Sequence, residues 1–186
     1  RRDFPILGTK VNGKPLVFLD NAASAQMPQP VIDRFVRYRT REHANIHRGV
    51  HYLSETATRE YEAVRGKVRA FINAGEDREI VYTSGTTDSI NLVAFGYGRK
   101  FIGAGDEIIL SVLVHHSNIV PWHFLRERRG AVLKWVETLP DGSLDMDSLA
   151  KQLGPRTKLL ALTHMSNVLG TVPDVQAAIA LAHGVG

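Results

Sequence analysis

The chain has 186 residues, no cysteine, and a formal charge of +4 from 23 basic and 19 acidic residues. Hydrophobic residues make up 44% and charged residues 23%, which is globular usage and excludes a disordered polyampholyte. Without cysteine, these residues cannot form a disulfide scaffold or a thiolate metal site. No apolar run reaches the roughly 18 residues of a membrane span, and no signal core follows the first residues, so we expect a cytoplasmic protein with no membrane partner.

Short apolar runs and turn residues predict the elements of the first third of the chain. The run at 16–19 predicts a strand, and the prolines before residue 31 predict a helix over 31–39. Ser54 is a predicted N-cap for a helix that ends near Asn73. One apolar stripe runs along this helix at Ala57, Tyr61, Val64, Val68 and Phe71.

Strands and helices alternate in the rest of the chain. Strands are predicted over residues 79–83, 106–112, 131–136 and 159–163, and helices follow the first, second and fourth of them, with a short helix over 144–153. This alternation predicts an α/β fold with a mostly parallel sheet and helices on both faces. The last helix is followed directly by Gly184-Val185-Gly186, where the pattern calls for another strand. We interpret the chain as an interrupted domain.

A basic cluster at Arg126, Arg128 and Arg129 is the densest in the chain, and Glu127 interrupts it. Because basic and acidic residues are mixed elsewhere, this cluster favours a solvated helix face over a phosphate-backbone footprint. We therefore expect no nucleic-acid partner.

Polar clusters follow three of the predicted strands, where parallel α/β sheets bind their ligands. Ser84-Gly85-Thr86-Thr87 is either a phosphate cradle at a helix N-terminus or a helix cap with Thr87 as the N-cap. His115-His116 could stack on an aromatic ligand or transfer a proton, or could be a hydrogen-bonded loop pair. Thr163-His164-Met165-Ser166-Asn167 is either a donor to an anionic oxygen or an asparagine-led turn.

Three further histidines, His43, His47 and His51, are spaced four residues apart. They could ligate zinc on a continuous helix, but Gly49 and the polar residues around it argue against such a helix. We expect no metal site.

With these clusters assembled, the sequence resembles the pyridoxal-phosphate (PLP) enzymes of the class V aminotransferase type. It resembles most closely the group II cysteine desulfurases, also called selenocysteine lyases. The matching motifs occur in family order and cover nearly the whole chain; they are Phe18-Leu19-Asp20-Asn21-Ala22-Ala23-Ser24-Ala25-Gln26, Ile46-His47-Arg48-Gly49-Val50-His51, Thr83-Ser84-Gly85-Thr86-Thr87-Asp88-Ser89-Ile90-Asn91-Leu92-Val93, His115-His116-Ser117-Asn118-Ile119-Val120-Pro121-Trp122 and Thr163-His164-Met165-Ser166-Asn167-Val168-Leu169-Gly170-Thr171.

The resemblance implies a role for each matching residue. Gly85, Thr86 and Thr87 match the phosphate-binding turn, with Thr87 as the main hydroxyl donor. His115 matches the histidine that lies against the pyridine ring. Asn167 matches the asparagine near the phenolic oxygen of PLP and the substrate carboxylate. Ala23 and His47 match substrate-side positions.

The resemblance also implies a fold and a division of the chain. Residues 1–53 would form an N-terminal segment with substrate-side loops, and residues 54–186 part of the PLP-binding large domain of fold type I. Three family elements have no match here: the aspartate facing the pyridine nitrogen, the Schiff-base lysine and the catalytic cysteine. We therefore expect the N-terminal portion of such an enzyme, inactive by itself.

The complete protein is expected to remove sulfur or selenium from L-cysteine or L-selenocysteine to give alanine. It would supply a sulfur-acceptor protein for iron–sulfur cluster assembly and act as a homodimer. Two alternatives stay open: another class V PLP enzyme, such as an aminotransferase, kynureninase-like or isopenicillin-epimerase-like protein, and a non-catalytic fragment that serves as an interaction module.

Overall fold

The computed structural model describes residues 1–185, and these divide into two compact units that meet between Tyr82 and Thr83. Each unit is described by itself. The functional division expected near residue 53 stays a prediction. Within residues 1–185, no helix combines the length and apolarity needed to cross a bilayer.

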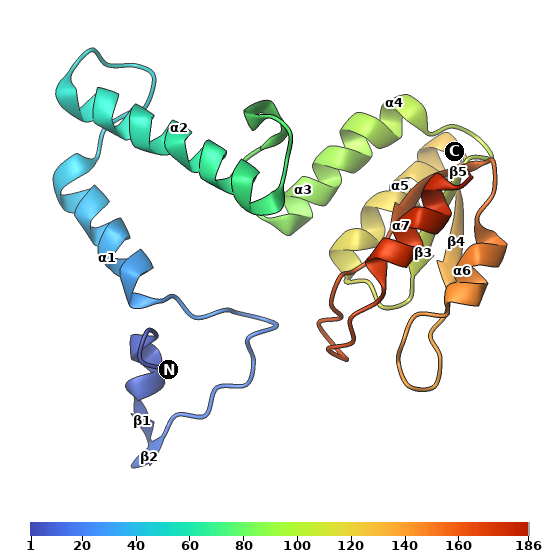
Figure 1. Cartoon of the computed structure of the whole chain (residues 1–186), viewed down its shortest axis with the longest axis horizontal. Coiled ribbons are helices and arrows are strands. Elements are labelled where there is room, and N and C mark those ends of the chain that lie inside the picture. Colours follow the sequence, from blue (N-terminus) through green and yellow to red (C-terminus); the bar gives the residue numbers. More distant parts are fainter. Residues whose placement is uncertain (186) are drawn as a thin grey trace. The chain divides into compact units, whose positions relative to one another are not determined.

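The first unit is built from two helices and several short elements. They are the 3₁₀ turn η1 (Pro5–Gly8), the antiparallel pair β1 (Lys10–Val11) and β2 (Lys14–Pro15), helix α1 (Gln29–Arg37), the π-helical turn η2 (Tyr38–Glu42), helix α2 (Tyr52–Ile72) and the 3₁₀ turn η3 (Asp77–Glu79). Figure 1 shows α2 as the longest of these helices.

Helix α2 begins earlier than the sequence predicts. Its N-cap is His51, whose Nδ1 accepts the backbone N–H of Ser54 at 3.4 Å. Ser54 is not the cap: it is buried, its hydroxyl donates to the carbonyl of Asn45 at 2.7 Å, and it accepts the N–H of Gly49 at 3.0 Å. These hydrogen bonds of Ser54 hold the loop that precedes α2 against the helix. The predicted end is confirmed, because Asn73 is a left-handed C-cap with φ 57°.

The second unit contains the sheet and the helices that cover it. Its elements are α3 (Thr86–Val93), the π-helical η4 (Ala94–Gly98), α4 (Arg99–Phe101), β3 (Glu107–Ser111), the 3₁₀ turn η5 (His116–Asn118), α5 (Val120–Arg129), β4 (Val132–Val136), α6 (Met146–Gln152), β5 (Thr157–Ala161) and α7 (Val175–His183). The predicted strands at 106–112, 131–136 and 159–163 are therefore confirmed, with their helices.

The three strands form a parallel sheet in the order β4-β3-β5. The central strand β3 is buried at every residue, and its apolar centre, Ile108-Ile109-Leu110, is typical of a strand covered on both faces. Helices lie on both sides of it (Figure 1). The predicted α/β architecture with a parallel sheet is confirmed.

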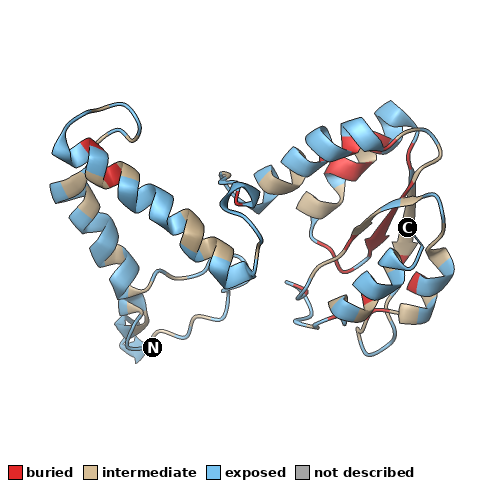
Figure 2. Ribbon diagram, turned by 45° about the horizontal axis from the view of Figure 1, so that its top comes forward, coloured by how far each residue is buried: buried red, intermediate tan, exposed pale blue. Residues whose placement is uncertain are grey.

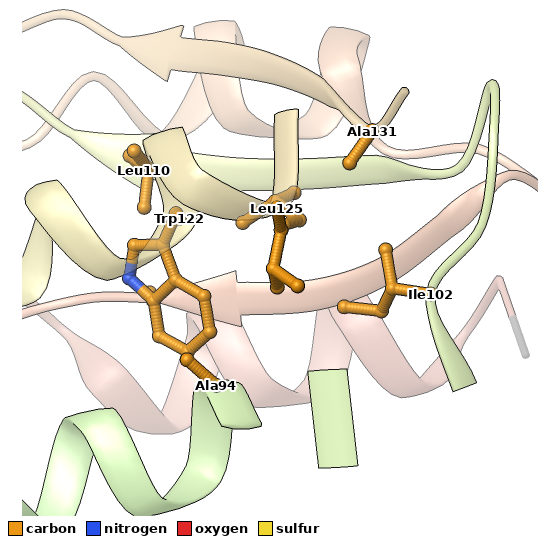
Figure 3. Packing of buried hydrophobic residues seen from close by; sticks show 8 residues of the cluster. Ala94, Ile102, Leu110, Trp122, Leu125 and Ala131 are labelled. Carbon is orange, nitrogen blue, oxygen red and sulfur yellow. The ribbon is translucent and has the colours of Figure 1, made fainter. Parts of the chain in front are cut away.

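Two hydrophobic clusters occupy opposite faces of this sheet. Alternate residues of β3 divide between them, since Ile108 and Leu110 belong to one cluster and Ile109 to the other. On the first face, Trp122 and Leu125 of α5 pack toward the helical segment that carries Ala94 (Figure 3). The second face packs against α6 and α7 through Leu149 and Ala178. Buried residues concentrate on β3 and the inner sides of its helices (Figure 2).

Two predicted strands are wrong. Residues 16–19 and 80–83 adopt no regular strand, and residue 79 ends the η3 turn. A strand needs a neighbour to accept and donate its backbone hydrogen bonds. Within residues 1–185 neither segment pairs with another strand, so Val17, Leu19 and Val81 stay exposed.

Candidate functional site

A hollow of about 620 Å³ opens at the carboxyl edge of the parallel sheet. Residues that follow all three strands line it: 112–116 after β3, Thr138 after β4 and 166–169 after β5. Ligands of open α/β sheets bind at this edge. The volume lies within the range of small-molecule sites.

His115 lines this hollow from the loop after β3. It is the N-cap of η5, and its Nδ1 accepts the N–H of Ser117 at 3.2 Å and lies 3.0 Å from the Ser117 hydroxyl. Because Nδ1 accepts a backbone N–H, the neutral ring carries its proton on Nε2. The ring of His116 lies edge-on, 5.8 Å away between centroids, so the two rings do not stack face to face. His115 is therefore an oriented Nε2–H donor.

Asn167 lines the same hollow from the loop after β5. The loop is held by buried Ser166, whose hydroxyl accepts the N–H of Val168 at 3.3 Å and of Leu169 at 3.1 Å. The backbone N–H of Ser166 donates to the carbonyl of Thr171 at 2.9 Å. Ser166 thus fixes the loop backbone, while Asn167 is exposed and lines the hollow.

The turn that precedes α3 has the geometry of an anion cradle. Gly85 is the N-cap with φ +154°, a conformation that L side chains rarely adopt, and open space surrounds the position of a Cβ there. Thr86 and Thr87 follow as the exposed first helical residues, so Gly85 rather than Thr87 caps the helix. Asp88 accepts the N–H of Ser84 at 3.1 Å, and within residues 1–185 the N–H groups of Gly85, Thr86 and Thr87 have no protein acceptor. Free N–H groups at a helix N-terminus favour an anion.

The structure brings some predicted residues together and leaves others apart. His115 and Asn167 share the hollow, whereas Gly85, Thr86 and Thr87 are not among the residues that line it. Helix α3, which follows the Gly85-Thr86-Thr87 turn, does contact η5, the turn that His115 caps.

Ala23 and His47 belong to the first unit. Ala23 lies in an exposed turn. His47 is left-handed with φ 59°; its N–H donates to the Thr58 hydroxyl at 3.0 Å, and its Nε2 lies 3.1 Å from a carboxylate oxygen of Glu62. His43 and His51 flank helix ends rather than share a helix with it. The hydrogen bond to Thr58 and the contact with Glu62 attach the backbone and the ring of His47 to α2.

Sequence reasoning missed several residues of the hollow. Thr138 follows β4 in a segment without a polar cluster, and Val168 and Leu169 supply its apolar part. The position of Thr138 in the chain could have indicated it, because residues just after β4 lie at the same edge of the sheet as residues just after β3 and β5.

The fold and the strand-end hollow define an α/β protein with a candidate ligand site at the carboxyl edge of its parallel sheet. Two solved structures have this fold: a cysteine desulfurase of Thermococcus onnurineus, 36% identical, with a TM-score of 0.89, and a cysteine desulfurase of Escherichia coli, 38% identical, with a TM-score of 0.83. Each match covers 99% of this chain, and 44% and 45% of the respective structures. The predicted fold type is thus confirmed.

The class-V aminotransferase family model matches residues 17–186, and the chain belongs to that family. A curated relative named cysteine desulfurase, from Serratia proteamaculans, is 52% identical over all 186 residues, which are 46% of its length. The chain therefore spans about half the length of the curated relatives it matches. The resemblance to the N-terminal portion of cysteine desulfurases is confirmed.

Proposed function

We propose that this chain forms the cofactor-holding part of a PLP-dependent cysteine desulfurase. The observation that carries the proposal is the joint placement of His115 and Asn167 on one hollow at the carboxyl edge of the sheet. The identity of about 50% with proteins named cysteine desulfurase supports the choice of reaction.

The residues present fit a phosphorylated, flat, aromatic ligand. Gly85 leaves open space at a helix N-terminus, as a phosphate requires. His115 offers an oriented ring and Nε2–H, and Asn167 offers an exposed amide. In this proposal the Gly85-Thr86-Thr87 turn holds the phosphate, His115 lies against the pyridine ring, and Asn167 donates to the phenolic oxygen.

When bound, PLP supplies an electron-withdrawing ring that stabilises negative charge on the α-carbon of the substrate. The residues of this chain bind and orient. Asn167 also donates to the substrate carboxylate, and Ala23 and His47 serve the substrate side. Fixing the reacting groups in place removes part of the entropic barrier of the reaction.

The proposed reaction converts L-cysteine, or L-selenocysteine, to alanine. The Cβ–S bond breaks, a bond forms between that sulfur and a receiving thiol, and the carbon skeleton takes up a proton. The 186 residues contain no cysteine, so in this proposal the receiving thiol lies outside them. We further propose that sulfur passes to an acceptor protein for iron–sulfur cluster assembly and that the complete protein is a homodimer.

Ligand binding by the chain tests the site directly. The probe is 4′-deoxypyridoxine 5′-phosphate, which lacks the aldehyde and cannot form imines with surface lysines, and the readout is tryptophan fluorescence quenching. We expect saturable binding that weakens about tenfold in Thr87→Ala and Asn167→Ala, which each lose about one charge-assisted hydrogen bond, and in His115→Ala, which loses the ring contact with the pyridine. His164→Ala is the matched control, because His164 follows β5 but does not line the hollow. Equal affinity in all variants would refute the site.

Activity tests the reaction. We expect alanine release from L-cysteine by the longest product of the gene, and none by the 186-residue chain. Transfer of an amino group to a 2-oxo acid without release of sulfur would instead favour another class V PLP enzyme.

A further inference from the structure

A second hollow, of about 380 Å³, lies in the second unit, away from the strand-end site, between the 94–99 helical segment and α5. Its floor is apolar and its rim is basic, and we refer to it as the arginine groove. It is lined by Ala94, Phe95, Arg99, Pro121, Phe124, Leu125, Arg128 and Arg129.

Close packing of two helices creates the groove. A Cβ built on Gly98 would lie 2.6 Å from Cδ1 of Leu125, so a larger residue at this position would have to displace the Leu125 side chain. Ala94, Pro121 and Leu125 are buried at the contact, whereas the rings of Phe95 and Phe124 are 54% and 38% exposed. Two aromatic rings thus stand at the surface beside a buried apolar floor.

The charge around this floor has one sign. Arg128 lies over the ring of Phe124 with its Cζ 5.0 Å from the centroid, and Arg129 approaches the carbonyl of Ile102 at 3.5 Å. Within residues 1–185, neither of them nor Arg99 forms an ion pair with a carboxylate. Arg126, on the same helix but outside the groove, does lie 3.8 Å from Glu127.

We propose that the arginine groove binds an acidic amphipathic segment of a partner protein. Apolar side chains of that segment would cover Phe95 and Phe124, and its carboxylates would pair with Arg99, Arg128 and Arg129. Aromatic residues and arginine are the types that contribute most at protein interfaces. The inference is independent of the proposed enzymatic function.

An extended nucleic-acid strand fits this surface less well. Such a strand needs a basic track that follows its phosphates. Here five of the eight lining residues are apolar, and three of these, Ala94, Pro121 and Leu125, are small or aliphatic and buried. The groove is therefore matched to a ligand with an apolar body and negative ends.

Selection of a random 12-residue peptide library on the immobilised 186-residue chain tests the proposal. We expect enriched sequences that combine Asp or Glu with large apolar residues. Enrichment of sequences without acidic residues, or no enrichment, would overturn it. The enriched peptide is then synthesised with a fluorophore, and its affinity is measured by anisotropy.

Matched variants locate the binding. The double variant Arg99→Gln/Arg128→Gln should weaken peptide affinity at least about fivefold, and this loss should shrink in high salt because exposed charges are screened. Arg126→Gln removes one positive charge from the helix that carries Arg128, but outside the groove, and should leave the affinity unchanged. Phe95→Ser should also weaken binding, whereas Phe101→Ser, 53% exposed before substitution and outside the groove, should not.

Three results would point to another occupant or none. Equal losses in Arg126→Gln and in the groove double variant would overturn the groove. If a single-stranded DNA 20-mer displaced the peptide, and its binding required Arg128, the groove would be a nucleic-acid surface and the proposal of a peptide ligand would be overturned. If the chain self-associated in sedimentation velocity and Phe95→Ser abolished this association, the occupant of the groove would be a second copy of the chain. Circular dichroism melting curves confirm that each variant is folded.

Discussion

Glu107 provides the sharpest test of how the sheet is held together. It is the first residue of β3, is 3% exposed, and its two oxygens lie 2.7 Å from Lys134 Nζ on β4 and 3.0 Å from Arg156, just before β5. Lys134 also donates to the carbonyl of Gln152 at 3.0 Å. One buried carboxylate therefore links all three strands at their amino edge.

Replacing Glu107 by Gln leaves the two cations without their counter-charge. Breaking a fully buried pair costs about 3–5 kcal/mol. Water still reaches both cations here, because the side chains of Lys134 and Arg156 are 31% and 71% exposed. We therefore expect a smaller loss of about 2 kcal/mol, which for a unit of this size lowers Tm by about 10 °C.

Thermal unfolding followed by circular dichroism at pH 7 measures this loss. Glu137→Gln is the matched control, since Glu137 is exposed and its substitution should change the free energy of unfolding by less than about 0.5 kcal/mol. The double variant Glu107→Gln/Lys134→Met should recover part of the loss, because it removes the unpaired charge as well. A Tm within about 2 °C of the wild type for Glu107→Gln would refute the reasoning.

The same carboxylate predicts the pH dependence of stability. The hydrogen bond from Lys134 lowers the pKa of Glu107 below its ordinary value of 4.5; desolvation opposes this, and the charges of Lys134 and Arg156 add to it. A lowered pKa in the folded state means that the stabilisation is complete above pH 4.5 and is lost as the pH falls through the folded pKa. The Tm difference between wild type and Glu107→Gln should therefore shrink below about pH 4.5.

Three further substitutions test local geometry. Gly98→Val should lower the free energy of unfolding by about 1–3 kcal/mol in urea titrations, because the new side chain meets Leu125; full retention of stability would contradict the close helix contact. Asp174→Ala removes the carboxylate that accepts the N–H of Ala177 at 2.9 Å and caps α7, and should cost about 1 kcal/mol in the same assay; the exposed Asp147 serves as the control. Gly85→Ala forces a side chain into φ +154° and should weaken binding of the PLP analogue about tenfold, as measured by fluorescence quenching; unchanged affinity would contradict the cradle.

The sequence predicts the second unit well because its signals are local. The β3 segment has an apolar centre, Ile108-Ile109-Leu110, and Gly130, left-handed at φ 75°, ends α5 where the next strand is expected. The segments at 16–19 and 79–83 also contain consecutive apolar residues, yet they form no strand within residues 1–185. Strand formation depends on a partner strand, and composition does not reveal whether one is present.

The candidate site shows the same division between local and non-local information. Its loop positions follow from the ends of predicted strands, so His115 and Asn167 could be proposed from the sequence. The Ser117 contacts that orient His115 and the Ser166 contacts that hold the second loop depend on loop backbone conformation, which residue types alone do not specify. The arginine groove depends on the approach of Gly98 to Leu125. From the sequence, two of its arginines, Arg128 and Arg129, are interpreted as part of a solvated helix face.

We expect the two edges of the sheet to serve different purposes, one for stability and the other for the proposed ligand binding. Glu107 begins β3 and Ser111 ends it, so the ion cluster and the ligand hollow lie at opposite ends of one five-residue strand. Glu107→Gln should therefore lower Tm while leaving the affinity for the PLP analogue unchanged at temperatures where the protein is folded. His115→Ala replaces an exposed residue, so it should weaken binding of the PLP analogue while leaving Tm unchanged. If both variants changed both properties together, the edges would be coupled, and the ligand loops could not be treated as additions to a sheet that is stable without them.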